Sequence, residues 1–290
     1  MQEITHAPVE RLAESAVTKD SSVTGDLRVH EFPSKIFRNT RRLRVWLPPG
    51  YEAPTNQGRY YPVLYLNDGQ NLFNSATAFN GIEWRVDETA DRLIRQGSVP
   101  PLIVVGIDHA QSDRMKEYLP FRSFSPAIPF PKGKYYPVFL LREVMPFVGE
   151  RYRIARGPES TGLGGSSLGA LISLYAAIVR PGIFGRLLLE SPSLYVSQRK
   201  ILRRSRTLRC WPDRVFLAVG TRESGQEDND RQVVEDVRTL GGIIRGAGSD
   251  EKRLLVMIEE NATHGESSWA SRFPQALEFL FGNNAEGQAR

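Results

Sequence analysis

Short runs of consecutive apolar residues alternate with longer amphipathic segments along most of this chain. Strands that are buried on both faces of a sheet have such continuous runs, whereas apolar residues at three- and four-residue spacing predict helices. The expected strands are residues 63–66, 102–107, 187–189, 215–219 and 254–258, and the expected helices are residues 84–94, 139–148, 171–179, 233–240 and 273–281. This alternation predicts an α/β fold with a doubly wound, mostly parallel sheet.

The residues before the first of these runs have a different pattern. Segments 27–32 and 43–47 alternate apolar and polar residues, and Pro48-Pro49-Gly50 follows the second. Such alternation is typical of half-buried antiparallel strands, so we expect an antiparallel amino-terminal edge. Residues 1–25 are polar and rich in turn formers, and we expect a loose arm there, followed by a single domain over residues 26–284.

Composition excludes several classes of protein. Cys210 is the only cysteine, so an intrachain disulfide and a cysteine-rich metal site are excluded. Residues 1–17 contain three glutamates and lack the apolar core of a secretory signal. No apolar run approaches the roughly 18 residues that a membrane span requires. We therefore expect a cytoplasmic protein without a membrane partner.

The chain carries a net charge of +5 at pH 7. Its densest basic run lies between Arg199 and Arg209, and no aromatic residues or nucleic-acid motif are interleaved with it. We interpret this run as an exposed surface helix, and most of the excess charge as solvated side chains. No nucleic-acid partner is expected.

The motif Gly165-Ser166-Ser167-Leu168-Gly169 nominates Ser167 as a nucleophile. Glycines two residues on either side of a serine permit a sharp strand-to-helix turn with strained torsion angles at the serine. The serine hydroxyl then stands at the carboxyl edge of the sheet, where α/β proteins bind their ligands.

A serine nucleophile needs a histidine base oriented by a carboxylate. His264 follows the last expected strand, in a predicted loop over residues 259–263, and completes the order serine, acid, histidine of α/β-hydrolases. Glu223 lies just beyond the preceding strand and is the first choice for the acid. Asp228 and Asp230 could reach the same point, and any of the three could instead cap the next helix.

An acyl-transfer site also needs donors for the oxyanion. One is the backbone N–H of Leu168, the residue after the nucleophile. The second is expected from Gln70 in Asn67-Asp68-Gly69-Gln70, with Gly69 at positive φ, although Asn-Asp-Gly could also be an ordinary tight turn. His109 follows a strand at the same edge and is either a substrate contact or an ordinary loop histidine. No metal or cofactor is needed.

Several motifs together carry a family resemblance. They are Leu47-Pro48-Pro49-Gly50-Tyr51, Leu64-Tyr65-Leu66-Asn67-Asp68-Gly69-Gln70-Asn71-Leu72-Phe73, Val105-Gly106-Ile107-Asp108 followed by Arg114 and Glu117-Tyr118, Tyr152-Arg153, Gly164-Gly165-Ser166-Ser167-Leu168-Gly169-Ala170, Phe184-Gly185, Ser191-Pro192-Ser193-Leu194, and His264-Gly265-Glu266 with Trp269. From about residue 26 to residue 281 the chain resembles the esterase D-like family of α/β-hydrolases, which includes enterochelin esterases, feruloyl esterases and mycolyltransferases.

The resemblance implies an α/β-hydrolase fold and a serine esterase. Members of the family often place the acid in a Gly-Thr-x-Glu or Gly-Thr-x-Asp segment, which lands on Glu223, and the residue after Asp-Gly supplies an oxyanion amide, which lands on Gln70. Arg114 and Trp269 are expected to contact substrate together with His109. Asn67 stands where relatives often have an apolar residue, so a more polar wall beside the oxyanion turn is expected.

The predicted reaction is hydrolysis of a small-molecule carboxylic ester through an acyl-enzyme, with an aromatic or siderophore-type ester as the expected substrate. Specificity is expected to lie in residues 109–136, where Arg114 and Glu117 could pair with each other. Two alternatives use the same residues: a non-catalytic hydrolase-fold binding protein, and an acyltransferase with an alcohol acceptor.

Overall fold

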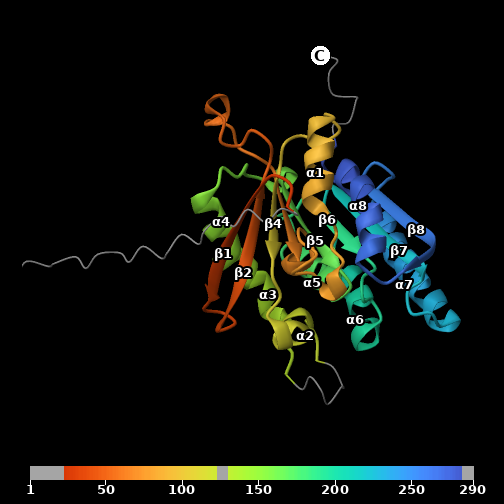
Figure 1. Ribbon diagram of the computed structural model, residues 1–290. Coiled ribbons are helices and arrows are strands. Elements are labelled where there is room, and N and C mark those ends of the chain that lie inside the picture. Colours follow the sequence, from red (N-terminus) through yellow and green to blue (C-terminus); the bar gives the residue numbers. More distant parts are fainter. Residues whose placement is uncertain (1–22, 123–129, 283–290) are drawn as a thin grey trace, which may run out of the picture.

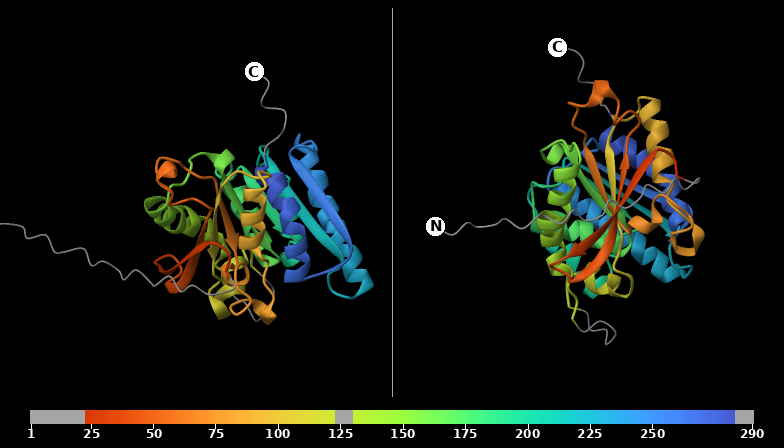
Figure 2. Two further views of the ribbon diagram at one scale, coloured as in Figure 1. Left: turned by 45° about the horizontal axis from the view of Figure 1, so that its top comes forward. Right: turned by 60° about the vertical axis from the view of Figure 1, so that its left-hand side comes forward.

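An eight-stranded sheet runs through the protein, and helices cover both of its faces (Figures 1 and 2). The computed structural model describes residues 23–122 and 130–282. The strand order is β1-β2-β4-β3-β5-β6-β7-β8, and the pairs β1–β2 and β2–β4 are antiparallel while every other pair is parallel. The predicted doubly wound sheet with an antiparallel amino-terminal edge is confirmed.

Seven of the eight strands match predicted runs, several of them longer than predicted, and β5 was not among those runs. The strands are β1 (Asp26–Ser34), β2 (Asn39–Leu47), β3 (Val63–Asn67), β4 (Ile103–Ile107), β5 (Thr161–Ser166), β6 (Arg186–Glu190), β7 (Arg214–Arg222) and β8 (Leu254–Thr263). The prediction of a loop over residues 259–263 was wrong, because β8 continues alongside β7 as far as the pair Arg222 and Thr263. The register between the two strands shifts between Gly220 and Arg222. His264 therefore follows the end of a strand directly.

Each predicted helix has a counterpart in the structure, whereas α2 was not predicted. The helices are α1 (Val86–Arg95), α2 (Arg114–Tyr118), α3 (Tyr136–Phe139), α4 (Met145–Arg151), α5 (Leu168–Val179), α6 (Val196–Ser205), α7 (Glu227–Gly246) and α8 (Glu266–Phe281). The helix expected over residues 139–148 is instead divided by a π-helical turn, Leu140–Val144. Pro146 has no N–H to donate to the carbonyl four residues earlier, which accounts for the break in the regular helix.

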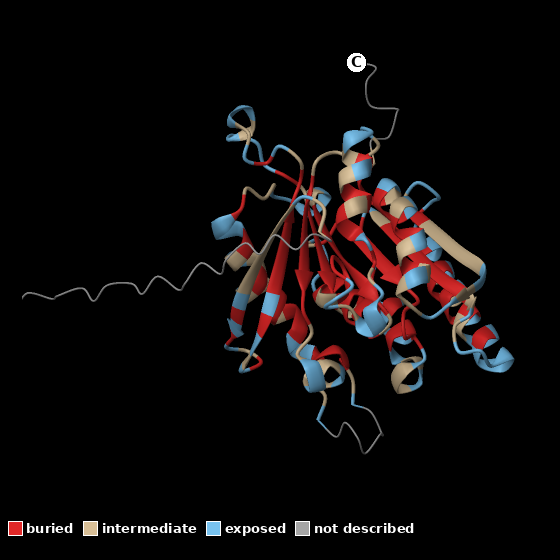
Figure 3. Cartoon of the chain, in the orientation of Figure 1, coloured by how far each residue is buried: buried red, intermediate tan, exposed pale blue. Residues whose placement is uncertain are grey.

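Two hydrophobic layers lie on opposite faces of the sheet. Val63 and Tyr65 of β3 face one layer, which includes residues of α3, α4, α5 and α7, whereas Leu64 and Leu66 face the other, which includes residues of α1 and α8. The central strands β3, β4 and β5 are buried along their whole length (Figure 3). Burial on both faces is the reason why β3 and β4 are nearly continuous apolar runs in the sequence.

The amino-terminal arm was expected over residues 1–25, and residues 1–22 lie outside the described part of the chain. Thr24 is attached to the domain: its N–H donates to Asp87 at 2.6 Å and its carbonyl accepts from the Trp46 indole at 2.7 Å. Within residues 23–122 and 130–282, no helix combines the length and hydrophobicity needed to cross a bilayer.

The chain turns sharply after β3, at the carboxyl edge of the sheet. Positive φ was expected at Gly69, and this was wrong, because Asp68 adopts the left-handed conformation instead, with φ of 59°. Glycine is required at position 69 because the neighbouring strand β4 leaves no room for a side chain there. A Cβ atom there would lie 2.6 Å from the carbonyl carbon of Gly106 and 2.8 Å from the amide nitrogen of Ile107 in β4.

Replacing Gly69 with alanine is expected to lower the free energy of unfolding by about 1–3 kcal/mol, because backbone atoms of β4 cannot move aside as a flexible side chain would. Urea unfolding measures this difference. Gly58→Ala is the matched control, since no atom lies within 4 Å of a Cβ at that position. Equal stability of the two variants would contradict the argument from close packing.

Candidate active site

Ser167 occupies the sharp turn between β5 and α5, with φ of 54° and ψ of −120°. Such a conformation is strained for a residue other than glycine, and strain of this kind concentrates at functional sites. The Ser167 N–H donates to the carbonyl of Glu190 at 2.9 Å, and the Ser167 carbonyl accepts from the N–H of Ser193 at 3.1 Å. These bonds hold the serine at the carboxyl edge of the sheet.

The two glycines of the motif allow the turn to pack closely against β3. A Cβ atom on Gly165 would lie 3.0 Å from the Cβ of Asn67, and one on Gly169 would lie 3.0 Å from Oδ2 of Asp68. The motif therefore requires glycine for close approach as well as for the strained turn, and the structure has the strand, turn and helix that the motif predicts.

His264 and Glu223 are brought together from the ends of β8 and β7. Nδ1 of His264 forms a short hydrogen bond with Oε2 of Glu223. The Glu223 side chain is 3% exposed, whereas that of His264 is 35% exposed, so the carboxylate is enclosed and the imidazole reaches solvent. This is the arrangement of an orienting acid and an accessible base.

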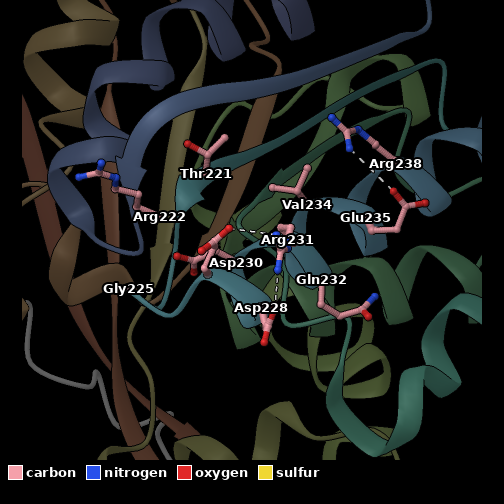
Figure 4. Close-up of a pocket in the computed structure, with 11 residues that line it drawn as sticks. Thr221, Arg222, Gly225, Asp228, Asp230, Arg231, Gln232, Val234, Glu235 and Arg238 are labelled. Atoms are coloured by element: carbon pink, nitrogen blue, oxygen red, sulfur yellow. Dashed lines mark hydrogen bonds and ion pairs between the residues drawn. The ribbon is translucent and has the colours of Figure 1, made fainter.

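The two alternative acids have other partners. Asp230 accepts hydrogen bonds from the N–H and the hydroxyl of Ser224, at 2.6 and 2.7 Å, and so ties the first turn of α7 to the loop before the helix. Asp228 forms an ion pair with Arg231 at 2.5 Å. Both carboxylates line a second pocket, of about 940 Å³, beside the first turn of α7 (Figure 4).

The Glu223 carboxylate is held in its ionised form. Burial raises its pKa, but hydrogen bonds from His264, from the Ser191 hydroxyl and from the backbone N–H of Gly220 outweigh that effect and leave the pKa below its ordinary value. The Ser191 hydroxyl and the Gly220 N–H each donate to Oε1 at 2.7 Å. The ionised Glu223 carboxylate can therefore accept a hydrogen bond from the Nδ1–H of His264.

Trp269 of α8 continues this network. Its indole N–H donates to the Ser191 hydroxyl at 3.0 Å, so a chain of hydrogen bonds runs from Trp269 through Ser191 and Glu223 to His264. The Trp269 ring also contacts the His264 imidazole edge-on, with centroids 5.2 Å apart. Trp269 is 5% exposed, and its indole N–H is directed at Ser191, which in turn donates to Glu223.

Most of the residues predicted for the site share one cleft, with a volume of about 1050 Å³. Among the residues that line it are Ser167, His264, Gln70, His109, Arg114 and Trp269. Leu168 is buried at the first position of α5. Gln70 is likewise in the first turn of a 3₁₀ helix, Gly69–Asn71. Amides at these positions have no carbonyl partner within their own helix, so they are available as donors.

Arg114 is committed to an ion pair inside this cleft. Its guanidinium bonds both carboxylate oxygens of Asp68, at 2.7 and 2.8 Å. The expected pairing of Arg114 with Glu117 was wrong, because Glu117 is buried and pairs with Arg41 at 2.8 Å. The two residues are on adjacent turns of the chain but contact different elements, which sequence spacing alone does not reveal.

His109 sits at the rim of the cleft, beside the oxyanion turn. Its N–H donates to the side-chain carbonyl of Gln70 at 3.3 Å, and its Nδ1 accepts from the N–H of Gln111. Burial lowers the pKa of the imidazole, which favours its neutral form. Residues 123–129 of the expected specificity segment lie outside the described residues.

Asn67 does not form the polar wall that was expected beside the oxyanion turn. It is 1% exposed, and its amide donates to the carbonyl of Gly169 at 3.0 Å and to the Ser173 hydroxyl at 2.8 Å. Its carbonyl oxygen accepts from the Tyr136 hydroxyl. The expectation was wrong because the side chain points toward α5, where it ties β3 to that helix.

Sequence reasoning assigned no role to the two serines of Ser191-Pro192-Ser193. Ser191 contacts Glu223, and the Ser193 hydroxyl lies 3.2 Å from that of Ser167. The position of this segment could have predicted a role in the site, because it follows β6 directly and so lies at the carboxyl edge of the sheet.

The Putative esterase family matches residues 34–280. The chain belongs to this family, whose members are hydrolases that act on esters, and the predicted family resemblance is confirmed.

Two solved structures and one curated relative illustrate the likeness. YbbA, an uncharacterized protein of Bacillus subtilis (strain 168), is 27% identical over 249 residues, which cover 84% of this chain and 94% of YbbA. The BES protein from Bacillus cereus is 19% identical, with a TM-score of 0.70 over 93% of this chain and 100% of that one. The enterobactin esterase FES from Shigella flexneri, in the presence of enterobactin, has 19% identity and a TM-score of 0.67, covering 88% of this chain and 58% of its own. Both structural likenesses establish the same fold.

Glu190, beneath Ser167, gives this region a dependence on pH. Burial raises the pKa of its carboxyl to about 7, against the opposing effect of Arg272. A raised pKa means that the folded state binds the proton more tightly than the unfolded state, so Glu190 stabilises the fold fully below its ordinary pKa of 4.5 and loses that contribution as the pH rises to about 7.

We therefore expect Glu190→Gln to flatten the fall in the free energy of unfolding between pH 5 and pH 7. Urea unfolding at a series of pH values measures the slope. Glu251→Gln, at an exposed position, is the control and should keep the slope of the unmodified protein. The same slope in all three proteins would refute the role of Glu190.

Proposed function

We propose that the protein hydrolyses carboxylic esters through an acyl-enzyme formed on Ser167. The observation that carries the proposal is that two features line the same cleft. One is a serine in a strained strand-to-helix turn, and the other is a histidine whose Nδ1 is hydrogen-bonded to a buried glutamate. This combination is the general solution for activating a serine hydroxyl at neutral pH.

In the proposed mechanism, Nε2 of His264 takes the proton of Ser167 as the serine oxygen attacks the ester carbonyl. Glu223 holds the imidazole in the tautomer with a proton on Nδ1 and stabilises the imidazolium that forms. The imidazolium then gives its proton to the departing alcohol. Water, deprotonated by His264, attacks the acyl-enzyme and releases the carboxylic acid and the free serine.

The backbone N–H groups of Leu168 and Gln70 are the proposed donors to the oxyanion. Each belongs to the first turn of a helix, where amides lack partners within the helix and where the helix dipole favours negative charge. Removing one such donor in other enzymes costs about 3–4 kcal/mol of transition-state stabilisation. The proposal needs no metal ion or cofactor.

The walls of the cleft support an aromatic ester as the substrate. Phe79 and Met115 line it and are 65% and 50% exposed, so each offers apolar surface to a bound ring. Arg42 lines the same cleft and is exposed. The structural neighbour named for enterobactin supports including siderophore-type esters with simple aryl esters in a substrate panel, and product analysis with an added alcohol separates hydrolysis from acyl transfer.

Ser167→Ala is expected to abolish hydrolysis of p-nitrophenyl acetate and labelling by a fluorophosphonate, because the nucleophile is removed. Ser193→Ala is the matched control, since its hydroxyl lies 3.2 Å from that of Ser167 but has no role as nucleophile in the proposal. Peptide mapping should place the label on Ser167 in both the unmodified protein and this control. Turnover retained by folded Ser167→Ala would overturn the assignment.

Trp269→Phe tests the hydrogen-bond chain behind the acid. The change keeps an aromatic ring but removes the N–H that donates to Ser191, and a lost hydrogen bond of about 1 kcal/mol corresponds to a roughly fivefold fall in kcat. KM should stay unchanged, because the lost atom is directed away from substrate. Trp84→Phe, in a ring that contacts Trp269, is the control. A change in KM alone would instead show that Trp269 binds substrate.

A further inference from the structure

The two edges of the sheet differ in chemistry. β1 carries charged side chains and Pro33, which discourage pairing with another strand. β8, at the opposite edge, has five consecutive apolar residues, 254–258, with no charge and no proline among them. In the sheet formed by the described residues β8 has one neighbour, β7, and its outer edge is visible at the right of the left-hand view in Figure 2.

The polar groups of the β8 backbone alternate between β7 and the outer edge. The carbonyl of Arg253 accepts from the N–H of Val215 at 2.8 Å, which sets the phase of the parallel ladder. In this geometry Leu255 and Met257 direct their N–H and C=O groups toward β7, whereas Leu254, Val256 and Ile258 direct theirs outward. The outer edge therefore presents a row of donors and acceptors at every second residue.

The charges that flank the apolar run of β8, residues 254–258, are self-complementary. Lys252 and Arg253 precede the apolar run, and Glu259 and Glu260 follow it. An antiparallel pairing of two copies with Val256 opposite Val256 places Leu254 opposite Ile258, Arg253 opposite Glu259, and Lys252 opposite Glu260. Opposite charges directly across an antiparallel pair are stabilising.

We propose that two copies of this chain associate through their β8 edges, antiparallel and centred on Val256, to form one continuous sheet. The same register that pairs the charges also pairs the outward N–H and C=O groups of Leu254, Val256 and Ile258 with those of the second copy. Residues 255–258 are half-buried in the single chain, and this pairing covers them further. The coincidence of hydrogen-bond phase, apolar residues and charge in a single register favours a second copy over an unrelated partner.

The flanking side chains are accessible for this pairing. Arg253 is 41% exposed, and its guanidinium donates to the carbonyl of Trp211 at 3.2 Å and lies 3.8 Å from Asp213. Glu259 is 37% exposed although one of its oxygens accepts from Arg272. Both can therefore reach a second copy without breaking a buried ion pair.

Val256→Pro is the decisive variant, because proline removes an N–H that points outward and takes no part in the ladder with β7. Sedimentation equilibrium of the full chain should give twice the 32.7 kDa chain mass for the unmodified protein, and the variant should raise the dissociation constant at least about tenfold. Val256→Thr keeps the N–H and should remain a dimer. Circular dichroism establishes that each variant is folded.

Arg253→Glu provides a second test that leaves the strand backbone intact. It places like charges opposite each other at both ends of the pairing and should also raise the dissociation constant, whereas Arg253→Lys should not. A monomer at chain concentrations up to about 100 μM would overturn the proposal, and so would a dimer that both Val256→Pro and Arg253→Glu leave unchanged. Neither readout depends on esterase activity.

Discussion

The buried guanidinium of Arg272 links the three elements on which the site depends. It lies in α8, is 2% exposed, and bonds Glu190 of β6 at 2.9 Å and Glu259 of β8 at 2.7 Å. Removing this guanidinium would leave the buried Glu190 side chain without its charged partner, which is strongly destabilising. One turn earlier in the same helix, Trp269 reaches Ser191, while Glu190 supplies the carbonyl that holds the Ser167 N–H. Ser167 and the residues that support Glu223 thus depend on the same guanidinium.

Three further arginine–carboxylate pairs line or underlie the cleft. Arg44 with Asp108, Arg41 with Glu117 and Arg114 with Asp68 are each buried or nearly so, with contacts of 2.7–2.8 Å. Their charges cancel locally. The basic composition of the chain therefore describes its outer surface, and it gives little information about the polarity of the site.

Local pattern was sufficient to predict most of the elements and the order of the candidate triad. Burial on both sheet faces produces continuous apolar runs, and the carboxyl-edge rule then places Ser167, Glu223 and His264 on one side. Contacts between distant segments were not predictable in this way. Asn67 turned out to tie β3 to α5, and Trp269 to support Glu223, because the direction of a side chain depends on neighbours a hundred or so residues away. The left-handed conformation occurs at Asp68 and not at Gly69 for the same reason. Glycine is required at position 69 by the close contact with β4, which the local sequence does not reveal.

The close approach of Gly69 to β4 has a consequence for how substrate range can change in evolution. Main-chain contact with Gly106 and Ile107 fixes the amide of Gln70 in space, so replacing the Gln70 side chain leaves the position of that amide intact. Phe79, Met115 and His109 belong to other segments and line the same cleft. Mutations can therefore change the side chains that line the cleft while the Gln70 amide keeps its position. The groups that would bind the substrate can thus evolve independently of that amide.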